Sequence, residues 1–382
     1  MELASVALAD LAPYRAEFPI LERQIYLNSC SLGALSRRSR ARVATFLDEW
    51  ESRGASAWYD VWWERLAELR RRYAGMIGAR ADEVALHASV STATAVIAGA
   101  LDHTDRRKVV TTDLDFPTVA YQWLAKRRRG IDVHIVRSPD GITVPPELIA
   151  DAVDDRTALV ATSHVFFTTG AIQDIRAVAA AAHAGGARCF IDAYQSVGQL
   201  PVDVHAAGVD FLCGGGLKWL LGGPGIAFLY VRGDLLPLLE PTVTGWFAHA
   251  RQFDFDSTRL VLHDDARRFE QGTPALAAVH AQLGGLDVLE EIGVPRIRRA
   301  AAALTEDLIA RARDRGLRPK VAPDPDARSA IVMLPSNDPH GDVARLAARG
   351  IVTDARPGHV RVSPYFYNVV EDHVTALEVL GP

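Results

Sequence analysis

The chain has 382 residues, a length that fits two or three packed units. Hydrophobic residues make up 49% and charged residues 23%, which is the composition of an ordinary folded protein and excludes an intrinsically disordered chain. The formal net charge of -5 is small, so it gives no reason to expect a nucleic acid as partner.

The N-terminal residues and the cysteines bear on the compartment. Residues 1–20 contain early acidic side chains and no uninterrupted apolar core, so they do not resemble a signal peptide. No stretch approaches the roughly 20 apolar residues of a membrane-spanning helix. Cys30, Cys189 and Cys213 form no CxxC pair, which argues against a disulfide framework and suits a reducing compartment. We expect a soluble, cytoplasmic protein without membrane partners.

Short β-rich runs alternate with alanine-rich helical runs through the middle of the chain. This rhythm predicts an α/β fold with a mostly parallel sheet between helices. Ligands of such sheets collect at the carboxyl ends of the strands. The seven predicted strands are Glu83–His87, Lys108–Thr112, Val133–Val136, Ala158–Thr162, Arg188–Asp192, Phe211–Gly214 and Ile226–Val231, and the helices lie near Thr92–Leu101, Thr118–Arg128, Glu147–Val153 and Ile172–Ala184.

The C-terminal third of the chain has a different pattern. A long helical region is expected from about Pro274 to Arg315, with a break near Gly293–Pro295, and Ala322–Ala327 is typical of a loop. The runs beyond it predict a small α/β unit, with elements at Ser329–Leu334, His340–Arg349 and His359–Ser363. We therefore expect an N-terminal segment (1–48) that packs with a small C-terminal domain (289–382), and a large domain (49–288) between them.

Asp192 ends an apolar strand with a carboxylate. Such a group in an interior sheet costs free energy unless a cation or hydrogen-bond donors meet it. One interpretation is a helix cap or turn residue. The other is an ion pair with a pyridinium nitrogen, which keeps a pyridine ring protonated and makes it an electron sink.

Lys218 lies in the glycine-rich stretch Gly214–Gly225 among apolar neighbours. Desolvation lowers the pKa of a lysine and favours the neutral amine that Schiff-base formation requires, although a lysine that reaches solvent is the alternative. The stretch is not a Walker phosphate loop, because Trp219 stands where that motif needs Ser or Thr. The sequence has no GxGxxG after a strand, no GxSxG, and no HExxH or CxxC, so no metal site is expected.

The segment His87–Ser91, which follows a predicted strand, is indicated as a phosphate-binding site. Ser91 and Thr92 open an alanine-rich helix, and hydroxyls with free backbone N–H groups at a helix start bind anions well. Simple N-capping explains the same residues equally well.

Several blocks occur in a characteristic order: YLNSCSLGALSRRSR, DFPTVAYQW, SHVFFTTGAIQDI, FIDAYQSVGQLPVDV, DFLCGGGLKWLLGGPGIAFLYV, TGWFAHA, RRFEQGTPALAAVHA and VRVSPYFYN. With these blocks the chain resembles, nearly end to end, the kynureninase branch of the class V aminotransferase superfamily. Its members are pyridoxal 5′-phosphate (PLP) enzymes of fold type I. The arrangement D-x-x-H/Q, then K-x-x-x-G-x-x-G, then GTP is specific to that superfamily.

The resemblance implies a role for each matching residue. Lys218 would form the Schiff base with PLP and later move the proton at Cα, and Asp192 would pair with the pyridinium nitrogen. Gln195 would hydrogen-bond the phenolic oxygen of the ring, and Phe116 would stack on it. Ser91 and the backbone of Val90 would bind the phosphate. Trp246 and Thr273 would reach the phosphate region of the neighbouring subunit, which implies a homodimer. Arg361 would bind the α-carboxylate of the substrate.

Three positions depart from the kynureninase pattern. Leu217 stands where kynureninases carry Tyr, Gln195 where they carry His, and Cys30 where they carry Asn, which argues against kynurenine hydrolysis. Cysteine desulfurases carry Gln at the position of Gln195, but they need a cysteine on a C-terminal loop, and no cysteine follows Cys213.

We therefore predict a PLP-dependent lyase that cleaves a bond at Cβ of an L-amino acid, with the C–S bond of a cysteine conjugate as the leading interpretation. Kynureninase-type hydrolysis, decarboxylation-coupled oxidative deamination and transamination use the same residues and stay open, as does a PLP-fold binding protein without turnover. Aromatic residues that could face the substrate side chain, although such residues more often belong to the core, are Tyr59, Phe166, Tyr365 and Tyr367.

Overall fold

The computed structural model describes residues 10–381. The first nine residues lie outside this range, so the expectations for residues 1–20 and for the segment 1–48 fall partly outside the described residues. Within residues 10–381, no helix combines the length and the apolar character that crossing a membrane requires.

A seven-stranded sheet forms the centre of the fold, with strand order β2-β8-β7-β6-β5-β3-β4. The pairs from β7 through β6, β5 and β3 to β4 are parallel, and β8 runs antiparallel to both β2 and β7. The predicted mostly parallel sheet is thus confirmed. The strands are β2 (Val84–His87), β3 (Lys108–Thr112), β4 (Asp132–Val136), β5 (Thr157–Ser163), β6 (Arg188–Asp192), β7 (Phe211–Gly215) and β8 (Ala227–Val231).

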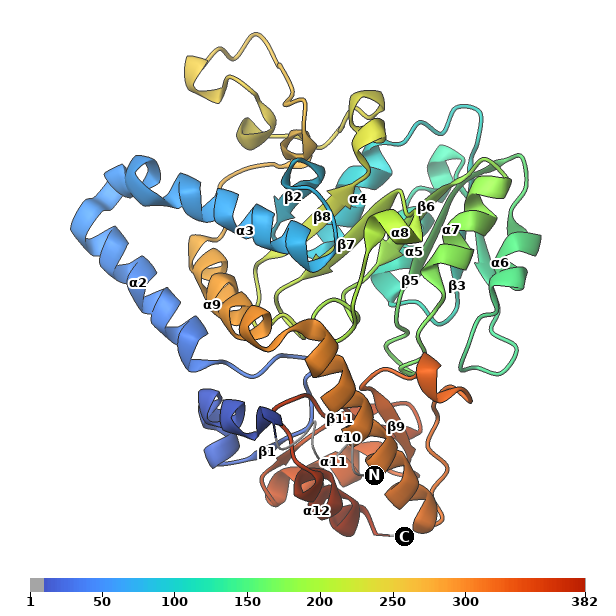
Figure 1. The fold of residues 1–382 in the computed structure, drawn as a ribbon. Helices are drawn as coiled ribbons and strands as arrows, with labels where there is room; N and C mark the ends of the chain where they lie inside the picture. Colours follow the sequence, from blue (N-terminus) through green and yellow to red (C-terminus); the bar gives the residue numbers. More distant parts are fainter. Residues whose placement is uncertain (1–9, 382) are drawn as a thin grey trace.

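Helices lie on both faces of this sheet (Figure 1). The interior strands β3, β5, β6, β7 and β8 are buried along almost their whole length because both of their faces are covered. In β6, Phe190 belongs to one hydrophobic cluster, whereas Cys189 and Ile191 belong to the other. The helices that follow the strands are α4 (Val90–Ala100), α5 (Pro117–Leu124), α6 (Pro146–Ala152), α7 (Ile175–Ala184) and the short α8 (Val204–Ala207).

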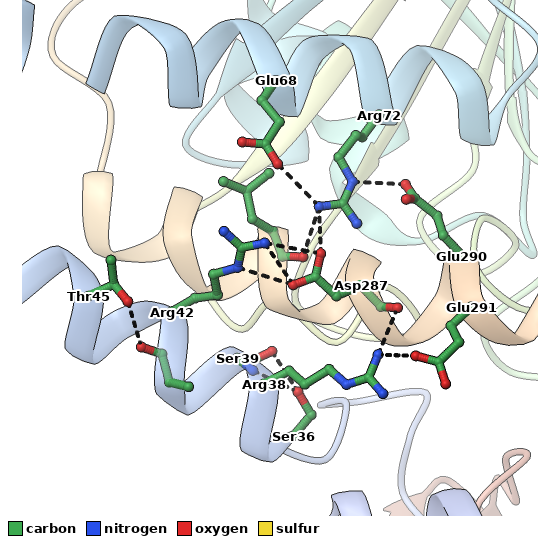
Figure 2. A network of polar contacts seen from close by, with 12 residues as sticks. Ser36, Arg38, Ser39, Arg42, Thr45, Glu68, Arg72, Asp287, Glu290 and Glu291 are labelled. Atoms are coloured by element: carbon green, nitrogen blue, oxygen red, sulfur yellow. Dashed lines mark hydrogen bonds and ion pairs between the residues drawn. The ribbon is translucent and has the colours of Figure 1, made fainter. Parts of the chain in front are cut away.

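Two further helices, α2 (Arg37–Arg53) and α3 (Trp63–Met76), were not predicted. The long helical region predicted from about Pro274 to Arg315 is present as α9 (Leu276–Ile292) and α10 (Val294–Asp314). The predicted break is present, because Gly293 ends α9 with a φ of 86° and Pro295 lies in the first turn of α10. Helices α2 and α9 pack side by side with α3 (Figure 1). Ion pairs join the three helices, and Figure 2 shows Asp287 of α9 between Arg42 of α2 and Arg72 of α3.

The C-terminal residues form a separate small sheet. Its antiparallel strands have the order β11 (Asp354–Arg356), β12 (His359–Val362), β9 (Val332–Pro335), and helices α11 (Pro339–Ala348) and α12 (Val370–Leu380) accompany them. The N-terminal strand β1 (Ile25–Tyr26) pairs with β10 (Ile351–Val352) in the same part of the molecule (Figure 1). The expected domain boundaries, after residues 48 and 288, fall inside α2 and α9, so the division remains a prediction.

Candidate active site

A small pocket lies at the carboxyl ends of β5 and β6, beside the loop that follows β7. This is the edge of a parallel sheet where ligands are expected. Four residues predicted from the sequence line it together. The lining residues are Phe116, Ser163, Val165, Phe167, Asp192, Tyr194, Gln195 and Lys218.

Asp192 is a buried carboxylate, 5% exposed, at the end of β6. Its Oδ1 accepts a hydrogen bond from the backbone N–H of Tyr194 at 2.9 Å. Burial raises the pKa of this carboxyl to about 6, while the Tyr194 N–H and the nearby Lys218 ammonium act in the opposite direction. A cationic ligand in the pocket would relieve the cost of burying this charge.

Lys218 follows β7 and is partly buried among apolar and aromatic groups. Its Nζ lies 4.4 Å from the centroid of the Tyr194 ring and 5.8 Å from that of Phe116. Desolvation lowers the pKa of this amine to about 8, and the negative charge of Asp192 partly opposes the shift. The amine therefore faces the pocket and not bulk solvent, in the environment that a nucleophilic lysine needs.

Two glycines allow the chain to approach Lys218 and Tyr194 closely. The N–H of Gly33 donates to the carbonyl of Leu217 at 2.8 Å, and a Cβ on Gly33 would lie 2.1 Å from the carbonyl oxygen of Lys218. A Cβ on Gly215 would lie 2.7 Å from Cε2 of Tyr194. Any larger residue at either position would displace backbone or an aromatic ring of the pocket.

The Gln195 side chain is held in one orientation. Its Oε1 accepts from the indole N–H of Trp219 at 2.8 Å, and its Nε2 donates to the carbonyl of Cys30 at 3.0 Å. Because the indole can only donate, the amide oxygen must face Trp219. One N–H of the amide is left for a ligand, which suits the predicted bond to a phenolic oxygen. That contact stays a prediction.

The predicted phosphate-binding site lies at the start of α4. Ser89 caps the helix by accepting from the Thr92 N–H at 3.2 Å, which leaves the first backbone N–H groups of the helix, at Val90 and Ser91, for an anion. The exposed Ser91 hydroxyl lies 3.3 Å from the hydroxyl of Thr118 in the first turn of α5. Thr118 was not predicted, although it follows the pocket residue Phe116 by two positions in the sequence.

Arg361 is almost fully buried, 2% exposed, in β12. Its Nη2 donates to Ser31 Oγ at 2.6 Å and to Asp354 Oδ2 at 2.7 Å, and its Nη1 donates to the carbonyl of Phe167 at 3.0 Å. Its Nε is buried and has no partner among the described residues. A buried, unpaired donor on a charged group is costly, so an anionic ligand is expected there.

The remaining predicted residues do not line this pocket. Trp246 is 42% exposed, Thr273 is also exposed, and both belong to the chain between β8 and α9. Segment 241–265, which contains Trp246, extends away from the body of the molecule (Figure 1). Exposure of this kind is required for contact with a second subunit, but that contact stays a prediction.

The aromatic residues considered for the substrate side chain belong mostly to the core. Phe166, Tyr365 and Tyr367 are buried, and the Tyr365 hydroxyl donates to the carbonyls of Gly198 and Trp219. Tyr59 is exposed on the surface. Of the three aromatic residues that do line the pocket, Phe116 was predicted, whereas Tyr194 and Phe167 were not, because an aromatic side chain carries the same sequence signal in a core and in a pocket.

The donor set suits PLP better than a metal ion. Among residues 10–381 there is no group of three or more His, Cys, Asp or Glu side chains placed to hold a metal. A lysine amine, a buried carboxylate, an aromatic face and a helix start instead match the aldehyde, ring nitrogen, ring plane and phosphate of that cofactor.

Comparison with known proteins places the fold among the PLP-dependent enzymes of fold type I. The solved structure of the cystine C–S lyase C-DES in complex with its product cysteine persulfide has a TM-score of 0.88 to this chain, at 21% identity, and covers 96% of this chain and 100% of that one. The aminotransferase class V model matches residues 33–374, and the chain belongs to that family of PLP-dependent enzymes.

Two curated relatives cover nearly the whole chain. The uncharacterised aminotransferase YcbU of Bacillus subtilis is 34% identical over 96% of this chain and 96% of its own length. The kynureninase of Pseudomonas fluorescens is 32% identical over 99% of this chain and 94% of its own length. The predicted resemblance to kynureninases is confirmed at the level of the family.

Proposed function

We propose that this enzyme cleaves the Cβ–S bond of a cysteine conjugate and releases a thiol, pyruvate and ammonia. The observation that carries the proposal is that Lys218 and Asp192 line one pocket. The buried Arg361, whose Nε is unpaired, adjoins that pocket, because its Nη1 donates to the carbonyl of the lining residue Phe167. Together these groups suit an α-amino acid: an amine-reactive lysine, an acid for a ring nitrogen and a cation for a carboxylate.

Each residue has a task in such a reaction. PLP, when bound, supplies an aldehyde for amines and a protonated ring that accepts electrons from Cα. The carboxylate of Asp192 would hold the proton on the ring nitrogen. The Lys218 amine, of lowered pKa, would remove the proton from Cα, and the Arg361 guanidinium would hold the carboxylate so that the Cα–H faces this base.

The residue before the lysine favours elimination over kynurenine hydrolysis. Leu217 has no hydroxyl and can neither donate a proton nor hydrogen-bond a phosphate. Its main-chain carbonyl accepts from Gly33, so the local backbone is occupied in holding the N-terminal loop. Hydrolysis of a C–C bond at Cγ needs further proton transfers, whereas expulsion of a thiolate from Cβ needs few.

Cleavage through a protein persulfide is not favoured. That route needs an accessible thiolate, and Cys30, Cys189 and Cys213 are all buried. Burial raises the pKa of the Cys189 and Cys213 thiols, so neither is a ready nucleophile. A lyase that releases the thiol directly does not require such a group. The name of C-DES, a cystine C–S lyase, supports C–S cleavage as a reaction that this fold can carry out.

The assay follows pyruvate and thiol release from a panel of S-substituted L-cysteines. We expect turnover of at least one conjugate, on the order of 1 per second, and none with Lys218→Ala. Absence of both products across the panel would contradict the proposal and direct attention to transamination or decarboxylative deamination.

Kynurenine hydrolysis is the second candidate, because the Pseudomonas kynureninase aligns with 99% of the chain. Release of anthranilate from L-kynurenine, measured by its fluorescence, tests it in the same preparations. We expect this rate to be at least roughly a hundredfold below that of the best cysteine conjugate. Comparable rates would show that Leu217 does not prevent hydrolysis.

A further part of the proposal is that the enzyme works as a homodimer with shared active sites. The exposure of Trp246 and Thr273 supports it, since a large exposed aromatic side chain on an extended segment is typical of an interface.

A further inference from the structure

Asp115 is a buried carboxylate, 7% exposed, in the loop between β3 and α5. Its Oδ2 accepts from Thr111 Oγ1 at 2.9 Å and from the N–H and hydroxyl of Thr112 at 2.8 and 2.9 Å. Its Oδ1 accepts from Thr162 Oγ1 at 2.9 Å and from the Ser163 N–H at 2.6 Å. Each oxygen thus binds one backbone N–H, and hydroxyl groups complete the set.

These donors come from two neighbouring strands at the edge where the pocket lies. Thr112 ends β3 and Ser163 ends β5, and the two strands are adjacent in the sheet. Ser163 lines the pocket and is the register partner of Asp192 on β6. Phe116, which also lines the pocket, directly follows Asp115. One carboxylate therefore connects two backbone segments that contribute residues to the pocket lining.

The fold alone does not require a charge at this position. A buried carboxylate is costly, and well-packed apolar side chains often replace buried ionic groups without loss of stability. The sheet ladder between β3 and β5 already joins the strands upstream. What the carboxylate adds is a fixed distance between the two strand ends, beyond the last ladder pair, where the pocket begins.

We propose that Asp115 is a positioning residue of the PLP site, which ties the ends of β3 and β5 together and so fixes Phe116 and Ser163 relative to Asp192. Asp115 contacts neither the substrate nor a transferred proton. Its negative charge also acts on Asp192, since it contributes to the raised pKa of that carboxyl.

The test is Asp115→Asn, with Asp113→Asn as the matched control. Asp115→Asn keeps the shape but replaces one acceptor oxygen by an NH₂ group, which would face a backbone N–H of Thr112 or Ser163. Asp113 lies in the same loop, its Oδ1 accepts from the Ser138 N–H at 2.9 Å, and its Oδ2 pairs with the exposed Arg137 at 3.7 Å. None of these three residues lines the pocket. The dissociation constant of PLP is measured by titrating each apoprotein and recording the absorbance and circular dichroism of the cofactor.

For Asp115→Asn we expect a roughly tenfold or larger increase in the dissociation constant of PLP and a changed circular dichroism of the bound cofactor, which reports ring orientation. Asp113→Asn should match the wild type in both. Urea unfolding of the apoproteins separates stability from binding. Lower stability of Asp115→Asn with an unchanged dissociation constant and dichroism would reduce Asp115 to a structural residue and overturn the proposal.

Thr111→Val provides a second, milder variant that decides the matter if Asp115→Asn does not fold. Thr111 is fully buried, and its hydroxyl donates to Asp115. Valine has nearly the same shape but lacks the donor, so we expect a smaller increase in the dissociation constant, roughly twofold to fivefold. Wild-type affinity and dichroism in Thr111→Val would count against the proposal. No substrate is added, so the outcome is independent of the proposed lyase reaction.

Discussion

The environment of Lys218 predicts how the apoprotein captures PLP at different pH values. Only the neutral amine attacks the aldehyde, and the pKa of this lysine lies at about 8 instead of 10.5. Below about pH 8 the charged form dominates, so the capture rate should rise about tenfold per pH unit and then level off above pH 8. Stopped-flow absorbance measures the rate, and PLP with free Nα-acetyl-lysine corrects for titration of PLP itself.

Replacing Asp192 by Asn gives this profile an internal control. The negative charge of Asp192 favours the Lys218 ammonium and so raises its pKa against the effect of burial. Removing that charge should move the levelling point to lower pH. Two results would show that Lys218 is well hydrated: a wild-type capture rate that keeps rising up to pH 10, or a levelling point that stays at the same pH in Asp192→Asn.

Arg361 makes a prediction about substrate binding. With the carboxylate held by a buried guanidinium, Arg361→Gln should raise KM for a cysteine conjugate roughly 10- to 100-fold, because a charge-assisted hydrogen bond is lost. The matching conjugate of cysteamine has no carboxylate and serves as the control substrate. Its kcat/KM should differ little between wild type and Arg361→Gln. Equal losses for both substrates would assign Arg361 to structure alone, through Asp354 and Ser31.

At the scale of elements, the ion pairs between α2, α3 and α9 predict a local contribution to stability. Asp287 bridges Arg42 at 3.0 Å and Arg72 at 2.9 Å, and it is only partly exposed (Figure 2). Asp287→Ala should lower the free energy of unfolding by about 1–2 kcal/mol, as measured in urea. Glu64→Ala, which breaks an exposed pair with Arg71, should cost under about 0.5 kcal/mol. Equal costs would mean that the Asp287 network is no stronger than a surface pair.

The elements differ in how well the sequence predicts them, and the reason is the range of the interactions that stabilise them. Each of the interior strands β5 to β8 contains a short apolar run because helices cover both faces of the sheet, so their pattern is local. Strands β1 and β10 have two residues each, and their pairing joins Ile25 to Ile351, which no local pattern can indicate. Helices α2 and α3 are highly charged, and their partners lie on α9, more than 200 residues away.

The same distinction applies to the site. Lys218 and Asp192 are predictable because a glycine-rich turn and a strand end mark them and the resemblance to class V aminotransferases implies their roles, and both line one pocket in the structure. Tyr194 and Asp115 are not predictable from the sequence, because their roles depend on side-chain contacts with other segments. One such contact is the close approach of Gly215 to the Tyr194 ring. Local motifs thus indicate the chemistry, while the shape of the pocket depends on tertiary contacts.

At the scale of the whole molecule, the proposed homodimer can be tested through Trp246. Sedimentation should give twice the mass of the 41.5 kDa chain. Trp246→Ala should weaken PLP binding, whereas Leu260→Ala, on the same segment and 54% exposed, should leave it unchanged. Mixing Trp246→Ala with Lys218→Ala subunits should restore one site per mixed dimer if the tryptophan acts across the interface. A monomer that binds PLP fully would contradict the arrangement.

The central claim is that Lys218 carries PLP, and mapping the attachment site tests it most directly. The chain has four lysines, Lys108, Lys126, Lys218 and Lys320, so each can be resolved by peptide mass spectrometry after borohydride reduction of the PLP-loaded protein. The account predicts a visible absorption band that borohydride abolishes, with the cofactor mass on the peptide that contains Lys218. Attachment to another lysine, or no band after PLP is added, would contradict it.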